Sequence, residues 1–418
     1  MTENSIEKTD KVVLLSVISD SDDKEVKEIS LDELERLAET AGAEVFCRMV
    51  QNKEAPNPAT YIGSGKAKEL KELCSNNDID LVIADDNLSP SQIKNLEDEL
   101  DGPDVIDRSM LILDIFAKHA ESAAGKLQVE LAQLKYTVPR LIGKGKDLSR
   151  LGGGIGTRGP GESKLETDRR HVKRRIDSLE EKLAEIEKNK MTQRGSRDKS
   201  GIFKFGIVGY TNAGKSTLLN RMTSAGVLAE DKLFATLDTT TRKYTMERGE
   251  EILLTDTVGL IRNLPHMLVE SFKSTLDEIK YSDALLIVID VSDPEFKSQL
   301  EVTEQLISEL GANELPKIYV FNKCDRGMTE KLNSRDKMEV YISALNGDGL
   351  KELESYMYQV VNENKHLYKI VLPMDRLSFV DYLYKNASVN SVEYRENGVY
   401  IEAVLDKKTK GMVEEFIQ

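Results

Sequence analysis

The 418-residue sequence predicts an α/β protein whose main domain has a mostly parallel sheet with helices on both faces. Three observations lead to this class. Apolar runs alternate with amphipathic helical patterns over 202–363, which is typical of parallel strands joined by helices. A glycine-rich phosphate-loop pattern stands directly between one such run and a helical segment. Elsewhere, leucines spaced by three and four residues predict paired helices.

Changes in this pattern divide the chain into four predicted domains. We expect a small α/β N-terminal domain over 1–119, a coiled helical hairpin over 120–195, the main α/β domain over 200–365 and a small α+β domain over 366–418. The strands expected in the first and third of these are 11–18, 43–50, 80–85, 203–209, 251–256, 284–290 and 316–322. The last domain shows a β-α-β-β-α order, with a hairpin turn at Asn397-Gly398.

The hairpin is predicted from two runs of apolar residues with coiled-coil spacing. Pro139 should end the first helix, and Glu162 or Ser163 should begin the second. We expect 188–201 to be a polar linker. The apolar positions are Leu127, Leu131, Leu134 and Val138 in the first run, and Leu165, Val172, Ile176, Leu179, Leu183 and Ile186 in the second.

Composition excludes several classes of protein. The longest strongly apolar run, 284–289, is far shorter than the roughly 20 residues that span a bilayer. The N-terminus is polar and lacks an apolar signal core, so we expect a cytoplasmic protein. The three cysteines are scattered, which argues against a disulfide framework or a zinc site. The net charge of −15 argues against nucleic-acid binding by the whole surface. We expect a monomer.

The phosphate loop is GYTNAGKS, from Gly209 to Ser216, and it fits the pattern G-x-x-x-x-G-K-[ST]. Backbone N–H groups of such a loop and of the following helix surround phosphates. Lys215 should reach the β- and γ-phosphates, and the Ser216 hydroxyl should bind Mg²⁺.

Two further motifs point to the nucleotide. Asp256 ends a predicted strand and opens DTVG, where a carboxylate can hold Mg²⁺ directly or through water and the Gly259 N–H can face the γ-phosphate. Asp325 of NKCD can pair with both N–H groups on one edge of guanine, a donor pair that adenine lacks. Ser343 and Ala344 can support the guanine O6 by a main-chain N–H. The set predicts a P-loop GTPase domain.

A switch threonine that closes on Mg²⁺ when the γ-phosphate is present should lie in FATLDTTTR. Thr236, Thr239, Thr240 and Thr241 are all candidates by spacing. With the motifs above, the predicted nucleotide site consists of Gly209, Asn212, Ala213, Gly214, Lys215, Ser216, Thr217, Phe234, Ala235, Thr236, Leu237, Asp238, Asp256, Thr257, Val258, Gly259, Asn322, Lys323, Asp325, Ser343, Ala344 and Leu345.

A basic, glycine-rich stretch lies between the two hairpin helices. Twelve Lys and Arg against four acidic residues give 135–175 a charge of +8 in an otherwise acidic chain. Basic groups neutralise phosphates, and glycines let the backbone approach an irregular surface, so we expect an RNA contact. No strand precedes GGGIG, which argues against a second nucleotide loop. A solvated flexible linker is the alternative.

The runs GGGIGTRGPGESKLETDRR, GYTNAGKSTLLN, LFATLDTTTR, DTVGLIRNLP and NKCD resemble the HflX family of translational GTPases over nearly the whole chain. This resemblance implies that Thr236 is the switch threonine on Mg²⁺, although Thr239 stands where family segments commonly have Pro. It also implies that the tip enters the large ribosomal subunit and that the GTP-bound protein dissociates stalled or idle ribosomes. The rRNA-binding residues expected on this basis are Arg150, Gly152, Gly153, Gly154, Arg158, Gly159, Arg169 and Arg170.

Leu260 occupies the position after DTVG where a polar residue, often Gln, aligns the attacking water in related enzymes. We expect slow intrinsic hydrolysis, with Lys215, Thr236 and Gly259 as the catalytic groups and the ribosome completing the site; Asn263 or His266 could instead align the water. Asn212 matches an asparagine that helps hold K⁺ in some related GTPases, or it simply shapes the loop.

Two other functions fit the same motifs. One is a GTP-switched assembly or regulatory factor for the large subunit that does not split ribosomes. The other is a protein-interaction module whose hairpin binds a protein. The basic glycine-rich tip favours an RNA partner over the second of these.

Overall fold

The structure is a computed structural model that describes residues 10–19, 23–138, 164–198, 202–223, 233–234, 239–262, 276–327, 338–363, 366–395, 397–405 and 407–417. These residues form two compact units. One holds the described residues up to Ala184 together with Leu233 and Phe234, and the other holds the rest. None of the described helices is both long and apolar enough to cross a membrane. The finer division into four domains stays a prediction.

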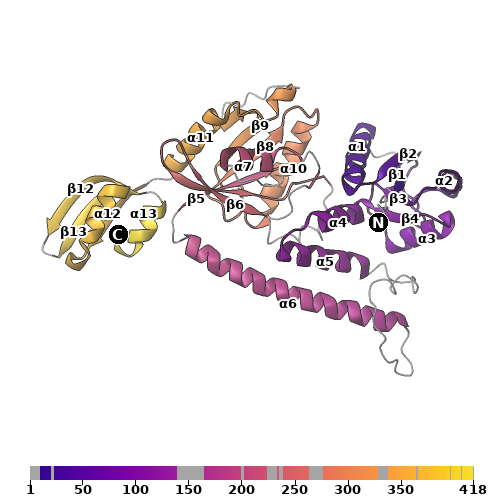
Figure 1. The fold of residues 1–418 in the computed structure, drawn as a ribbon, viewed down its shortest axis with the longest axis horizontal. Coiled ribbons are helices and arrows are strands. Elements are labelled where there is room, and N and C mark those ends of the chain that lie inside the picture. Colours follow the sequence, from indigo (N-terminus) through magenta and orange to yellow (C-terminus); the bar gives the residue numbers. More distant parts are fainter. Residues whose placement is uncertain are drawn as a thin grey trace, which may run out of the picture. The chain divides into compact units, whose positions relative to one another are not determined.

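The first unit contains a four-stranded parallel sheet with strand order β2-β1-β3-β4 (Figure 1). β1 is buried along nearly its whole length, as a strand covered on both faces should be. The predicted N-terminal α/β sheet is confirmed, and β4 adds a four-residue strand too short to stand out in the sequence. The elements are β1 (Lys11–Ile18), α1 (Lys24–Ala41), β2 (Glu44–Asn52), α2 (Ser64–Asn77), β3 (Leu81–Ala84), α3 (Pro90–Leu100), β4 (Asp104–Asp107) and α4 (Arg108–His119).

A buried ion network ties helices α1 and α4 to the carboxyl edge of this sheet. The Arg108 guanidinium is 3.0 Å from an Asp85 carboxylate oxygen, and the two side chains are only 3% and 1% exposed. Arg108 also pairs with Glu33, and the Ser30 hydroxyl donates to Asp85 at 3.0 Å. Burial raises the pKa of Asp85, and the nearby Arg108 charge opposes that rise. The network brings charged side chains from α1, α4 and the loop after β3 together in a largely buried site.

The predicted helical hairpin is confirmed as α5 (Ala123–Thr137) and α6 (Lys164–Asp198). Leu131 and Leu179 are buried. Arg175 donates twice to the Glu130 carboxylate, at 2.7 Å each, which links the two helices. The expected linker over 188–201 is wrong for most of its length, because α6 continues to Asp198. Its Lys, Met, Gln and Arg residues are good helix formers, and polarity alone does not stop a helix.

The second unit contains a six-stranded sheet of order β10-β9-β8-β5-β7-β6. All neighbouring strands are parallel except the edge pair β6–β7. This confirms the mostly parallel sheet, while β6, TTRKYT, carries too little apolar pattern to be expected. The elements are β5 (Phe203–Gly209), α7 (Lys215–Thr223), β6 (Thr240–Thr245), β7 (Glu251–Asp256), β8 (Ala284–Asp290), α10 (Phe296–Glu309), β9 (Lys317–Asn322), η3 (Cys324–Arg326), β10 (Met338–Tyr341) and α11 (Leu350–Glu363).

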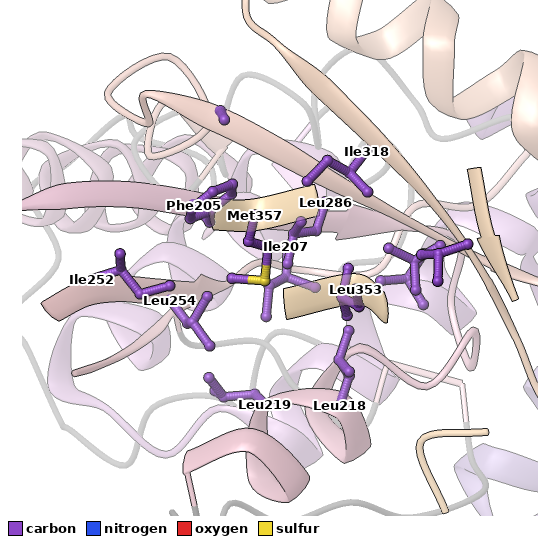
Figure 2. Close-up of a cluster of buried hydrophobic side chains, with 14 of the residues drawn as sticks. Phe205, Ile207, Leu218, Leu219, Ile252, Leu254, Leu286, Ile318, Leu353 and Met357 are labelled. Carbon is purple, nitrogen blue, oxygen red and sulfur yellow. The ribbon is translucent and has the colours of Figure 1, made fainter. Parts of the chain in front are cut away.

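The core of this sheet positions the loops at the carboxyl ends of its strands. Figure 2 shows side chains of α7 and α11, including Leu218, Leu219 and Met357, packed against side chains of the central strands. Helix α10 packs against β5 and β8, its buried Phe296 and Ile307 stand outside this cluster, and successive residues of β8 are buried on both faces. Because both faces are covered, ligands are expected at the strand ends.

A three-stranded antiparallel sheet of order β11-β13-β12 closes the chain and confirms the predicted α+β arrangement. One face packs against helices through Ile370, Leu383 and Ile401. The elements are β11 (His366–Leu372), η4 (Met374–Arg376), α12 (Ser378–Asn386), β12 (Ser388–Arg395), β13 (Gly398–Leu405), α13 (Lys407–Val413) and η5 (Glu414–Phe416).

Candidate nucleotide-binding site

The phosphate loop connects the end of β5 to the start of α7, as its sequence pattern requires. The Lys215 ammonium donates to the carbonyls of Gly209 and Tyr210 at 3.1 and 2.8 Å, which holds it inside the loop. Burial lowers the pKa of Lys215 to about 8, partly opposed by the Asp256 charge. A desolvated cation held in this way is suited to receive phosphate charge.

The loop backbone depends on residues that tolerate a left-handed conformation. Gly214 has φ +94°, and a Cβ there would lie 2.2 Å from the Asn322 amide nitrogen. Asn212 has φ +60°, a conformation that Asn adopts more readily than most residues. This geometry favours the loop-shaping interpretation of Asn212, and its potassium role stays a prediction.

Ser216 and Asp256 form the pair expected for Mg²⁺. The Ser216 hydroxyl donates to one Asp256 oxygen at 2.6 Å, while the other oxygen is buried without a hydrogen-bond partner. Burial raises the pKa of Asp256, opposed by the Lys215 charge and the Ser216 hydrogen bond. An orphaned carboxylate oxygen beside a hydroxyl fits a hydrated Mg²⁺, which when bound neutralises charge on the phosphates.

The DTVG segment is joined to the phosphate loop by its backbone. The Thr211 N–H donates to the Leu260 carbonyl at 2.8 Å, and the Leu260 N–H donates to the Gly209 carbonyl at 3.2 Å. The Arg262 N–H donates to the Tyr210 hydroxyl at 2.8 Å. These bonds bring Gly259 beside the loop, where its N–H is expected to face the γ-phosphate.

The NKCD and Ser343-Ala344 segments meet at the ends of β9 and β10. Asn322 links them to the phosphate loop: its amide donates to the Ala213 carbonyl at 2.8 Å and accepts from the Ala344 N–H at 2.9 Å. The Ser343 hydroxyl donates to Asp325 at 2.5 Å. Asp325 is otherwise exposed, so its carboxylate is available to a base with two donors.

The remaining predicted residues are placed as follows. Thr217 and Val258 lie within these segments, the Thr257 hydroxyl donates to the Ile207 carbonyl at 2.7 Å, and Leu345 is 67% exposed. Phe234 belongs to the first unit, where its ring packs edge-on against the ring of Phe116, with the two ring centroids 4.7 Å apart.

Some predicted residues are not described by the structure. Ala235, Thr236, Leu237, Asp238, Asn263 and His266 lie outside the described residues, as do Arg150, Gly152, Gly153, Gly154, Arg158 and Gly159 of the tip. Arg169 and Arg170 are exposed on α6. The roles of all the predicted site residues stay predictions.

Two ion pairs at this site were missed. Lys323 of NKCD pairs with Asp290 at 2.8 Å, and Arg262 pairs with Glu295 at 3.1 Å. The sequence could have pointed to Asp290, because it ends a buried strand of the parallel sheet and ligands bind at the carboxyl ends of such strands. Glu295 carried none, since it lies in a polar turn before α10.

A mostly parallel sheet with this phosphate loop and carboxylate defines a P-loop nucleotide hydrolase. A family model described as 50S ribosome-binding GTPase matches residues 204–323. Models described as GTP-binding GTPase N-terminal and GTP-binding GTPase Middle Region match 28–117 and 119–197.

The chain belongs to the HflX family of GTPases. It is 49% identical to GTPase HflX of Caldanaerobacter subterraneus over 98% of this chain and 94% of that protein. It is 44% identical to GTPase HflX of Escherichia coli over 79% and 78%. A solved structure of a GTP-binding protein from Sulfolobus solfataricus in complex with GDP is 28% identical, covering 84% of this chain and 98% of that one with a TM-score of 0.45. Membership of this family and the match to the 50S ribosome-binding GTPase model make the protein a GTP-hydrolysing enzyme, as expected.

Proposed function

We propose that the protein binds the large ribosomal subunit through the tip of the α5–α6 hairpin and dissociates stalled or idle ribosomes in its GTP state. GTP hydrolysis, stimulated by the ribosome, then releases it. The match of the nucleotide domain to a 50S ribosome-binding GTPase family carries this proposal. The cytoplasm is the compartment where such a protein would work.

The hairpin supplies the second support, because its helices are joined before the tip. Leu179 is fully buried. Lys135 pairs with Glu180 at 2.7 Å, in addition to the Arg175–Glu130 pair. Exposed ion pairs contribute only about 0–1 kcal/mol each, so apolar packing is the main force that holds the helices together. The predicted rRNA-binding residues between Arg150 and Arg170, within the basic stretch 135–175, would then contact rRNA phosphates.

In the nucleotide site we propose that Lys215, Gly259 and Thr236 stabilise the transferring phosphoryl group. Ser216 and Thr236 would hold Mg²⁺, with Asp256 holding it through water. Asp325 would pair with the guanine donors, and Asn212 would assist a bound K⁺. Equal hydrolysis rates in NaCl and KCl would remove the potassium role.

Splitting requires that the GTP state bind the free large subunit more tightly than it binds the intact ribosome. A nucleotide shifts such an equilibrium only by its differential affinity for two states. Moving a population from 1:99 to 99:1 takes about 5.5 kcal/mol. GTP and the rRNA contacts of the tip must supply that difference together.

The test is a ribosome dissociation assay. Intact ribosomes are mixed with the protein and GTP, GDP or a slowly hydrolysed GTP analogue, and the subunits are separated by sedimentation. We expect dissociation with GTP and with the analogue, and none with GDP. Ribosomes that stay intact while large subunits bind the protein would instead support an assembly or regulatory factor.

A charge-reversal pair tests the tip without deleting it. Arg169→Glu with Arg170→Glu should reduce dissociation, because both side chains are exposed on α6 at the basic end of the hairpin. Lys182→Glu with Lys188→Glu is the matched control: it makes the same charge change further along α6, outside the predicted rRNA contact. Equal loss in both variants would contradict a specific role for the tip.

A further inference from the structure

The nucleotide site contains a second buried oxygen without a hydrogen-bond partner. Besides the Asp256 oxygen assigned to the Mg²⁺ shell, the Thr211 hydroxyl is buried and makes no hydrogen bond. Thr211 is only 6% exposed. Buried polar groups are nearly always satisfied, and a native exception calls for an absent partner or a functional role. Thr211 occupies a variable position of the phosphate loop, so no motif accounts for its hydroxyl.

Main-chain hydrogen bonds hold Thr211 opposite the DTVG segment. Its N–H donates to the Leu260 carbonyl at 2.8 Å, and the preceding Tyr210 forms a parallel bridge with Leu260. Leu260 itself is buried and offers only its backbone here. At this junction between the loop and DTVG, the side chain of Thr211 can hydrogen-bond, whereas the apolar side chain of Leu260 cannot.

Distances place Thr211 beside the expected γ-phosphate. A Cβ built on Gly259 would lie 2.8 Å from the Thr211 methyl carbon and 3.2 Å from the Lys215 ammonium. The Thr211 Cα would lie 2.9 Å from the same built Cβ, so Thr211 and Lys215 both lie against Gly259. Because Lys215 reaches the β- and γ-phosphates in this motif, the Thr211 side chain lies at the γ-phosphate end of the site. Its hydroxyl is bonded to the same carbon as that methyl group.

We propose that the Thr211 hydroxyl orients the water that attacks the γ-phosphate, in place of the polar side chain that Leu260 lacks. The hydroxyl accepts a hydrogen bond from the water and donates a hydrogen bond to a γ-phosphate oxygen, keeping its own proton. The water oxygen forms a bond to the γ-phosphorus as the bond to the β,γ-bridging oxygen breaks. GDP leaves with that electron pair, the water proton stays on the released phosphate, and Thr211 is unchanged.

The test compares two variants under single-turnover conditions with protein in excess over GTP, so that the chemical step is measured. Thr211→Val keeps the shape and removes the hydroxyl, and Thr211→Ser restores the hydroxyl without the methyl group. We expect Thr211→Val to slow hydrolysis by about 10- to 100-fold, at or below the low end of the roughly 100-fold or larger effects of positioned polar groups. GTP affinity and Tm should stay near those of the native protein, and Thr211→Ser should recover most of the rate.

Thr303→Val is the matched control. Its hydroxyl, also buried in this unit, donates to the Gln299 carbonyl at 2.8 Å within α10. This variant should not change the rate. A Thr211→Val rate within twofold of native would overturn the proposal. A lower rate that is accounted for by weaker GTP binding or by a lower Tm, and that Thr211→Ser does not restore, would show a structural role for Thr211. That result would overturn the proposal as well.

Discussion

Asp325→Asn tests guanine recognition most sharply, because the structure isolates this carboxylate. One oxygen accepts from the Ser343 hydroxyl at 2.5 Å, and the side chain is otherwise exposed toward solvent. In the proposed complex it accepts two N–H groups of guanine. Hydrogen bonds to charged groups contribute about 1.5–3 kcal/mol each. Losing both costs about 3–6 kcal/mol, which is roughly 10²- to 10⁴-fold in GTP affinity.

The variant should also gain affinity for XTP, since the new amide can donate to the xanthine carbonyl. Competition against a fluorescent guanine nucleotide at equilibrium measures both affinities. Ser343→Ala is the control: it removes only the orienting hydroxyl and should cost about 1 kcal/mol, near fivefold. GTP affinity within twofold of native for Asp325→Asn, or no gain for XTP, would refute this role.

Two further predictions follow from buried charges. The pKa of Lys215 is lowered to about 8, and bound phosphate should raise it again, so GTP affinity should fall as pH rises above 8. Calorimetry at pH 9 in two buffers should show uptake of about one proton per GTP; no uptake would contradict this. Arg108→Ala should lower the free energy of opening of β1 and β3 by about 3–5 kcal/mol, because the Asp85 carboxylate is left buried without its ion-pair partner. Hydrogen exchange of the intact chain measures this. Arg48→Ala, which removes exposed pairs with Asp32 and Glu35, should cost only about 1 kcal/mol. Equal costs for both variants would refute this reasoning.

The sequence motifs were sufficient to predict the elements that carry the phosphate loop. A glycine-rich loop, a carboxylate and NKCD each follow a buried strand, and the carboxyl ends of parallel strands gather at one edge. The hydrogen bonds of Asn322 to Ala213 and Ala344 show this gathering directly. The parallel sheets and the hairpin were also predictable, because their apolar periodicity is local.

Other features depend on contacts that no local pattern carries. The edge strand β6 is held by pairing with β7, and its sequence is mostly polar. The missing partner of the Thr211 hydroxyl can be seen only after burial and hydrogen bonds are known. The contact of Phe234 with Phe116 joins residues more than a hundred positions apart. The last part of α6 has no apolar pattern, so the sequence predicts a linker where the helix continues to Asp198.

GTP hydrolysis with and without purified large ribosomal subunits tests the proposed ribosomal role most directly. It should be measured for the intact protein and for a variant lacking Gly152–Gly161 of the predicted tip. We expect subunits to stimulate the intact protein, the deletion to remove this stimulation, and intrinsic hydrolysis to be unchanged. If subunits stimulate neither protein, or both equally, the tip is not an rRNA probe coupled to the nucleotide site.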